Sequence, residues 1–230
     1  MAEDTGVHSI KKTGRSVPTD RDRSWQTKPT DRFVLRWIKI HLSARITPAL
    51  LNRGWLVPWM ITLLAAALGC MAGLVFAMGS GWLAGCIAAV AQILDGVDGQ
   101  YARLTGRESR GGAFLDSVLD RYADGAMIIG LTIYLIRLPS SLPTGWLIFL
   151  GALALIGSNL ISYSTSRAEG LGLSLGKATL ASKGTRTVAL ILSGWGSLLW
   201  PPLPIAALLY LGLHTNAVVV SRLIRAARAS

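Results

Sequence analysis

The feature that most constrains the fold is a series of apolar runs, each about as long as a helix that crosses a bilayer. Such a helix needs roughly 20 predominantly apolar residues to cover ~30 Å of hydrocarbon. Short polar or proline-containing breaks separate the runs. This pattern predicts an all-α integral membrane protein with six transmembrane helices. The predicted spans are Leu56–Met78, Trp82–Leu104, Gly112–Arg137, Gly145–Arg167, Thr185–Trp200 and Ile205–Ala226.

The segment before the first span divides into two parts. Residues 1–30 are polar and lack apolar periodicity, which predicts a flexible cytoplasmic tail. Residues 31–53 carry a basic and an apolar stripe at helical spacing, and this predicts a juxtamembrane amphipathic helix on the membrane surface. An ordinary amphipathic helix packed on another domain is the alternative. The remaining residues, 54–230, then form the six-helix membrane domain.

The net charge of +11 indicates a membrane partner rather than nucleic acid, because the basic residues flank the apolar runs. Under the six-span threading, these residues gather in connections on one side, which predicts that both termini are cytoplasmic in a cell-membrane protein. Cys70 and Cys86 lie inside apolar runs, so neither a disulfide framework nor a zinc site is expected.

Four aspartates stand out within this apolar chain. Asp95 and Asp98 are three residues apart, and Asp116 and Asp120 are four apart, so each pair projects from one face of its own helix. A charge near hydrocarbon costs at least ~2.5 kcal/mol on insertion scales, so intramembrane carboxylates usually face a cavity, ion or partner. Two antiparallel helices joined by a short connection would bring all four together.

Converging carboxylates favour a hard divalent cation, which relieves their repulsion. Oxygen ligands without Cys or His indicate Mg²⁺ or Mn²⁺ and a substrate that carries phosphate. Asp124 extends the stripe, but Arg121 beside it suggests a structural charge pair. A cation channel or transporter, which also lines its path with carboxylates, and a catalytically silent scaffold are the alternatives.

The segment Asp95–Asp120 fits D-x2-D-G-x2-A-R-x8-G-x3-D-x3-D and resembles the signature of the CDP-alcohol phosphotransferase family. The resemblance implies a homodimeric membrane enzyme that transfers a phospho-alcohol group from a CDP-alcohol to a hydroxyl acceptor and releases CMP. It also implies two metal ions and makes Asp120 the general base. The implied metal ligands are Asp95, Asp98, Asp116 and Asp120.

The same resemblance assigns the nucleotide site. The residues that match positions contacting CDP are Thr62, Gly99, Arg103 and Ser109. Thr62 belongs to a Pro-x3-Thr segment that begins at Pro58. In this segment Trp59 replaces the Asn or Asp common after the proline.

The acceptor region is similar to that of prokaryotic phosphatidylinositol-phosphate synthases. Arg167, Lys183 and Arg186 are the residues expected to grip an anionic acceptor phosphate, although Thr165 stands where that subfamily has Lys. Simple orienting charges are the alternative. CDP-diacylglycerol is the expected donor. CDP-inositol is the other candidate, because Lys28–Asp31 resembles the linker before this domain in di-inositol-phosphate-phosphate synthases.

Overall fold

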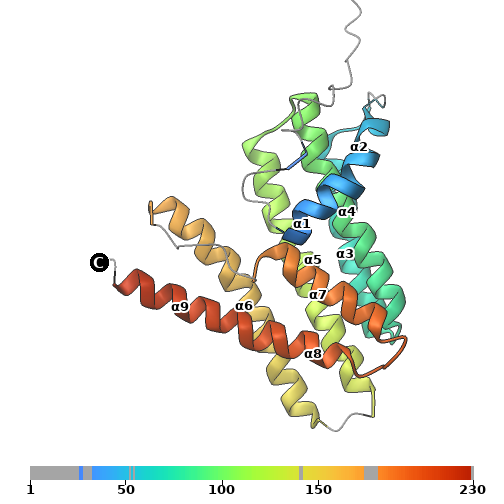
Figure 1. The fold of residues 1–230 in the computed structure, drawn as a ribbon, viewed down its shortest axis with the longest axis vertical. Coiled ribbons are helices and arrows are strands. Elements are labelled where there is room, and N and C mark those ends of the chain that lie inside the picture. Colours follow the sequence, from blue (N-terminus) through green and yellow to red (C-terminus); the bar gives the residue numbers. More distant parts are fainter. Residues whose placement is uncertain are drawn as a thin grey trace, which may run out of the picture.

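The computed structural model describes residues 26–27, 33–51, 53, 55–139, 142–173 and 181–228, and every regular element among them is helical (Figure 1). Apart from residues 26–27, the predicted tail lies outside the described residues. The elements are α1 (Phe33–Ile38), η1 (Lys39–Ser43), α2 (Ala44–Leu50), α3 (Pro58–Ala77), α4 (Gly81–Thr105), α5 (Arg110–Arg137), α6 (Thr144–Gly170), α7 (Lys183–Gly196), α8 (Pro204–Leu209), η2 (Tyr210–His214) and α9 (Thr215–Ala227).

Four helices are long and apolar enough to cross a membrane: α3, α4, α6 and the continuous helix Pro204–Ala227. The predicted third span corresponds to α5, whose first half carries the acidic residues of the signature. The predicted fifth span corresponds to α7, which has only 14 residues and ends before the Trp200–Pro204 break. All six predicted helices are therefore present, and the number of membrane crossings remains a prediction.

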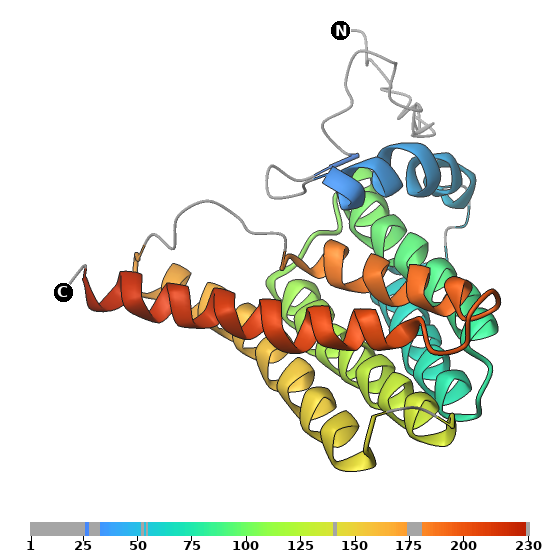
Figure 2. The ribbon, with the colours of Figure 1, turned by 60° about the horizontal axis from the view of Figure 1, so that its bottom comes forward.

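Helices α3, α4, α5 and α7 form the body of the molecule, and α6 runs alongside α8–η2–α9 with their far ends extending away from the body (Figures 1 and 2). The largest buried cluster joins α3, α5, α6 and α8 through side chains such as Phe76, Leu131, Leu147 and Leu208. This core lies on one side of the acidic residues of α4 and α5. It therefore holds the two signature helices in place.

Small residues let α3 approach α5 closely. A Cβ added at Gly130 would collide with the carbonyl oxygen of Gly73, so the two backbones touch. Gly106 ends α4 in the left-handed region at φ +63° and turns the chain toward α5. Ser109 then begins α5 by accepting the backbone N–H of Gly112 at 3.0 Å. This short connection brings the start of α5 near the end of α4, and α3 packs against both helices.

The juxtamembrane segment α1–η1–α2 lies across the end of α4 (Figure 2). It is helical, as predicted, but its packing differs from a simple surface helix. Lys39 is only 9% exposed, while Trp37 is 55% exposed. The reason is Gly96, whose missing side chain leaves room for Ser43 and the stem of Lys39. Gln100 of α4 also donates to the carbonyl of Lys39 at 2.9 Å.

Candidate active site

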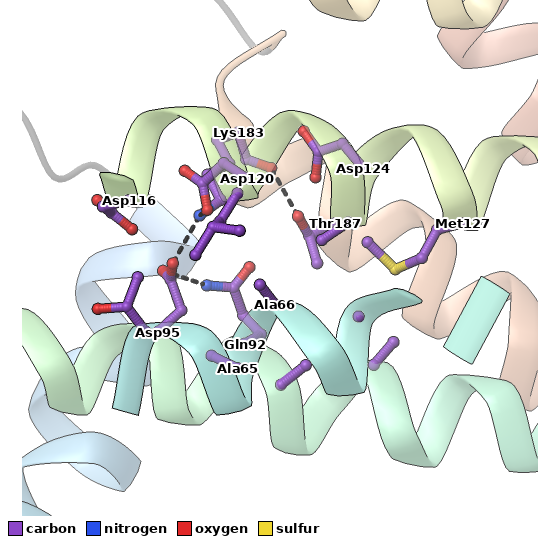
Figure 3. Close-up of a pocket in the computed structure, with 16 residues that line it drawn as sticks. Ala65, Ala66, Gln92, Asp95, Asp116, Asp120, Asp124, Met127, Lys183 and Thr187 are labelled. Carbon is purple, nitrogen blue, oxygen red and sulfur yellow. Dashed lines mark hydrogen bonds and ion pairs between the residues drawn. The ribbon is translucent and has the colours of Figure 1, made fainter. Parts of the chain in front are cut away.

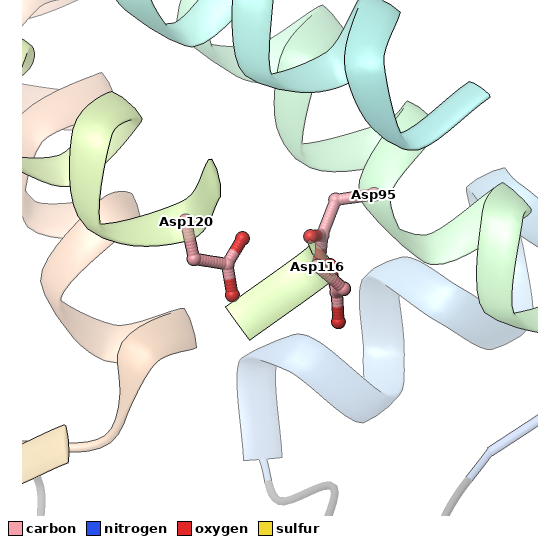
Figure 4. Close-up of side chains that lie close together, drawn as sticks. All are labelled: Asp95, Asp116 and Asp120. Atoms are coloured by element: carbon pink, nitrogen blue, oxygen red, sulfur yellow. The ribbon is translucent and has the colours of Figure 1, made fainter. Parts of the chain in front are cut away.

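Three of the four predicted aspartates meet at one point. Asp95 comes from α4, and Asp116 and Asp120 come from successive turns of α5 (Figure 4). One carboxylate oxygen of each lies within 4.8 Å of one oxygen of the other two. Three carboxylates at this distance repel one another, and a cation bound between them would relieve that repulsion.

Asp98 takes a different place from the other three. Its side chain is 7% exposed and borders a cleft of about 430 Å³ that Asp116 also lines. Asp116 in addition lines a smaller inner cavity together with Asp95 and Asp120. Asp98 therefore lines the cleft, Asp95 and Asp120 line the inner cavity, and Asp116 lines both spaces.

The donor set fits a divalent metal of the oxygen-binding type. All the converging groups are carboxylates, which suits Mg²⁺ or Mn²⁺ rather than zinc. Their spacing also leaves room for one cation to contact oxygens from both α4 and α5. The residues that could hold it directly are Asp95, Asp116 and Asp120, with Asp98 available from the cleft side.

A lysine ammonium already contacts two of these carboxylates. Lys183, the first residue of α7, places Nζ 2.7 Å from Asp95 Oδ1 and 2.5 Å from Asp120 Oδ1 (Figure 3). The other oxygen of Asp95 accepts a hydrogen bond from Gln92 Nε2 at 3.2 Å. Sequence spacing gave no sign of the Lys183 contact, because this residue is 88 positions from Asp95. The Gln92 contact was not anticipated either, although a spacing of three residues on one helix could have suggested it.

The predicted nucleotide residues gather around the cleft. Thr62, Gly99, Arg103 and Ser109 all line it. A Cβ at Gly99 would lie 3.4 Å from the Arg103 guanidinium, so this glycine keeps the cleft open beside the arginine. The first turn of α5 borders the same space, and a helix N-terminus is suited to bind phosphate. Trp59 also lines the cleft and is 49% exposed.

The predicted acceptor residues have three different environments. Arg167 is exposed at the end of α6, and Lys183 contacts the acidic cluster. Arg186 is 3% exposed, with Nη2 3.1 Å from Asp124 Oδ2 and Nη1 donating to the carbonyl of Ala181 at 2.8 Å. Asp124 is thus a charge partner, as predicted, but its partner is Arg186 and not the neighbouring Arg121.

A further arginine was not anticipated. Arg222 of α9 reaches α6, where Nη1 donates to Ser164 Oγ at 2.6 Å and to Thr165 Oγ1 at 3.0 Å. A cationic group therefore stands beside Thr165, the position where the related subfamily carries a lysine. The sequence could have suggested this arginine only as one of several basic residues near the C-terminus.

Several known proteins are similar to this chain in sequence. An archaetidylinositol phosphate synthase of Pyrococcus horikoshii is 33% identical over 150 residues, which cover 65% of this chain and 74% of that protein. A phosphatidylinositol phosphate synthase of Mycolicibacterium smegmatis is 31% identical over 166 residues, covering 72% and 73%. A bifunctional IPC transferase and DIPP synthase of Thermococcus kodakarensis is 36% identical over 140 residues, but this chain spans only 30% of that protein's length.

A solved structure shares the fold. The crystal structure of Mycobacterium tuberculosis phosphatidylinositol phosphate synthase with CDP-DAG bound superposes with a TM-score of 0.69 at 27% identity, and the match covers 79% of this chain and 92% of that one. The same enzyme has been solved with manganese and citrate. A sequence profile for CDP-alcohol phosphatidyltransferases matches residues 55–223. This chain therefore belongs to the CDP-alcohol phosphatidyltransferase family of enzymes.

Proposed function

We propose that this chain transfers a phosphatidyl group from CDP-diacylglycerol to a hydroxyl of a phosphorylated polyol such as inositol phosphate, releasing CMP. The observation that carries the proposal is the meeting of Asp95, Asp116 and Asp120 beside a cleft that holds the rest of the signature. The relatives support the substrate class, since two are phosphatidylinositol-type or archaetidylinositol phosphate synthases and one solved neighbour holds CDP-DAG.

The donor nucleotide fits the cleft by its charge. Arg103 and the first turn of α5 can bind the diphosphate, and the apolar wall that includes Trp59 suits the base. The ligands proposed for two divalent ions are Asp95, Asp98, Asp116 and Asp120. When bound, such ions neutralise the negative charge that develops on the phosphate oxygens during transfer.

The transfer itself needs one proton acceptor. The acceptor hydroxyl attacks the phosphorus attached to the donor alcohol, a new P–O bond forms, and the bond to the CMP phosphate breaks. Asp120 accepts the proton of the attacking hydroxyl, because its carboxylate faces the inner cavity at the centre of the cluster. Arg103 holds the departing CMP through its phosphate.

Basic side chains from three helices suit an anionic acceptor. Arg167 comes from α6, Lys183 and Arg186 come from α7, and Arg222 comes from α9. Arg186 is 3% exposed and bound to Asp124, so it would act on the acceptor through its positive charge rather than by direct contact. Arg222 occupies the neighbourhood of Thr165 and can supply the positive charge that a lysine supplies in the related subfamily.

The membrane arrangement proposed for this enzyme follows from the sequence pattern. Six helices cross the cell membrane, and both termini and the basic connections lie on the cytoplasmic side. A homodimer is the proposed assembly, as the family resemblance implies. Trp37 and Trp55, 55% and 66% exposed, suit a membrane–water boundary.

CDP-inositol is a second candidate donor, favoured by the 36% identity to the bifunctional IPC transferase and DIPP synthase. A substrate panel separates the two. Purified protein is incubated with CDP-diacylglycerol or CDP-inositol, with several polyol phosphates and Mg²⁺ or Mn²⁺, and products are identified by mass. CMP release with a phosphatidyl product supports the proposal. CMP release from CDP-inositol alone would show that the second candidate is the donor. No CMP from any donor would refute both.

Asp95→Asn is the inactive reference for this panel, since it removes one carboxylate of the cluster. Glu169→Gln is the matched control, because Glu169 is an exposed carboxylate at the end of α6 and outside the cluster. The control should release CMP at the wild-type rate. Equal loss in both variants would indicate a general effect of acidic residues on the protein rather than a site at Asp95.

A further inference from the structure

Lys183 and a divalent ion need the same oxygens. Nζ of Lys183 contacts Oδ1 of Asp95 and Oδ1 of Asp120, and these two carboxylates belong to the three-residue cluster that suits a metal (Figure 3). The lysine thereby links α7 to both signature helices. Its side chain is 26% exposed, so it lies at the edge of the cluster and not deep inside the protein.

The two cations exclude each other at this place. A magnesium ion binds carboxylate oxygens at ~2.0–2.1 Å, so an ion held by Asp95 and Asp120 would stand beside the ammonium at close range. Both are positive, and the surrounding cavity is only about 30 Å³, which leaves little water to screen them. The hydrogen bond from Gln92 to Oδ2 opposes rotation of the Asp95 carboxylate away from this conflict.

The Lys183 side chain can move away from the two carboxylates, whereas Arg186 on the same helix is held in place. A lysine side chain has four rotatable methylene groups, and this one has its partially exposed ammonium at the first residue of the helix. Arg186, three residues later, is 3% exposed and fixed by Asp124 and the carbonyl of Ala181. Displacement of Lys183 would therefore free one cation without disturbing the packing of α7.

We infer that Lys183 is an internal competitor for the metal site: the ammonium and the divalent ion occupy the Asp95 and Asp120 oxygens alternately. Metal binding releases the ammonium, which can then bind the anionic group of the acceptor. This inference rests on the metal-dependent transfer proposed above and adds an order to it. The acceptor gains one of its binding groups only after the metal has bound.

The first test measures metal affinity. Mn²⁺ binding to purified protein is titrated by electron paramagnetic resonance for the wild type, Lys183→Met and Arg121→Gln. We expect the apparent Kd of Lys183→Met for Mn²⁺ to be lower than that of the wild type by about tenfold or more. If the ammonium leaves the wild-type site free only about a tenth of the time, the wild type binds Mn²⁺ about tenfold more weakly than a site that is always free. Arg121 is the matched control, because it is also a cation beside Asp120. Its guanidinium lies 3.9 Å from Asp120 Oδ2 and is only partly buried. Its removal should change Kd by less than about threefold.

The second test uses the wild-type chain and does not depend on the variant folding. Lysine amines are labelled briefly with an acylating reagent at increasing Mn²⁺, and each site is quantified by mass spectrometry. Lys183 should become several-fold more reactive, with the same midpoint as Mn²⁺ binding. Lys11 and Lys12 are the internal references, because the sequence places them in the polar N-terminal segment, more than 80 residues before Asp95. Their reactivity should stay constant.

The outcomes separate this inference from the proposed function. If the wild type binds Mn²⁺ and releases CMP while Lys183 stays protected, or if Lys183→Met binds Mn²⁺ no more tightly, the competition is wrong and the transferase stands. A parallel rise in Lys11 and Lys12 reactivity would mean that Mn²⁺ changes the labelling of every lysine, and would also overturn it. Absence of both Mn²⁺ binding and CMP release would overturn the proposed function, and the inference with it.

Discussion

Two ion pairs lie one turn apart between the same two helices, and they differ in almost every property that matters for function. Lys183 and Arg186 of α7 are three residues apart, and their partners on α5, Asp120 and Asp124, are four apart. The outer pair is 2.5 Å long with side chains 26% and 18% exposed. The inner pair is 3.1 Å long with side chains 3% and 11% exposed.

The difference shows how one helix face can carry both chemistry and structure. Asp120 shares its surroundings with two other carboxylates, so its cation can be exchanged for another. Asp124 accepts a hydrogen bond from the deeply buried Arg186, which also donates to a backbone carbonyl. A buried pair of this kind is costly to break, because one uncompensated charge is left behind. The outer pair should therefore control activity and the inner pair stability.

The largest expected effect is the loss of activity in Asp120→Asn. The amide cannot accept the proton of the acceptor hydroxyl, and general-base catalysis contributes about 10²–10⁴-fold. CMP release should fall by at least that factor, while the thermal unfolding temperature in detergent changes little. Asp124→Asn is the matched variant one turn further along α5. If it lost as much activity per folded molecule as Asp120→Asn, the division between the two pairs would be wrong.

The second effect concerns the inner pair. Arg186→Met leaves the Asp124 carboxylate buried without its cation, which typically costs about 3–5 kcal/mol. Thermal or denaturant unfolding should show this loss. The double variant Arg186→Met with Asp124→Leu should recover much of it, because two apolar groups replace both charges. A fully stable Arg186→Met enzyme with only a raised KM for the acceptor would instead make Arg186 an acceptor contact without a structural role.

This comparison also marks how far the sequence could predict the molecule. The helices were predictable because their apolar runs are long and their ends carry glycine, proline or polar residues, so all six predicted segments are helical. Three of the four signature aspartates were correctly expected to meet, because spacings of three and four residues set their faces. The helices and the faces of each aspartate pair are local properties, and local spacing encodes them. The place of Asp98 outside the cluster depends on how the two helices are held.

Contacts that join distant segments were not predictable from spacing. Lys183 reaches Asp120 across 63 positions, and Arg222 reaches Thr165 across 57. Burial of Lys39 depends on the space that Gly96 leaves on another helix. In each case tertiary packing determines the partner. The sequence around a basic residue does not show whether its side chain contacts a substrate, a carboxylate or water.

A third, smaller effect tests how the outer site is oriented. Gln92 is 3% exposed and donates to Asp95 Oδ2, so it should fix the carboxylate that faces Lys183. Gln92→Met removes the donor at similar volume. Loss of such a supporting hydrogen bond typically weakens metal binding by about 10–100-fold, and Mn²⁺ titration should show this.

Gln100 provides the matched control for Gln92. It lies on the same helix and is fully buried, but it binds Thr47 and the backbone of Lys39 in the juxtamembrane segment. Gln100→Met should lower stability and leave Mn²⁺ affinity close to that of the wild type. Equal losses of Mn²⁺ affinity in both variants would show that any buried glutamine on α4 supports the site, and the role given to Gln92 would fail.

The smallest effect is expected at Arg121, which extends the comparison to a third and weakest pair. Its guanidinium lies 3.9 Å from Asp120 Oδ2, and its side chain is 33% exposed, so solvent screens the attraction. Exposed pairs typically contribute about 0.2–1 kcal/mol. Arg121→Gln should therefore shift the free energy of unfolding by less than about 1 kcal/mol and change CMP release by only a few-fold. A loss of stability as large as that of Arg186→Met would mean that burial does not determine how much each pair contributes. The difference between the exchangeable outer pair and the structural inner pair would then need another cause.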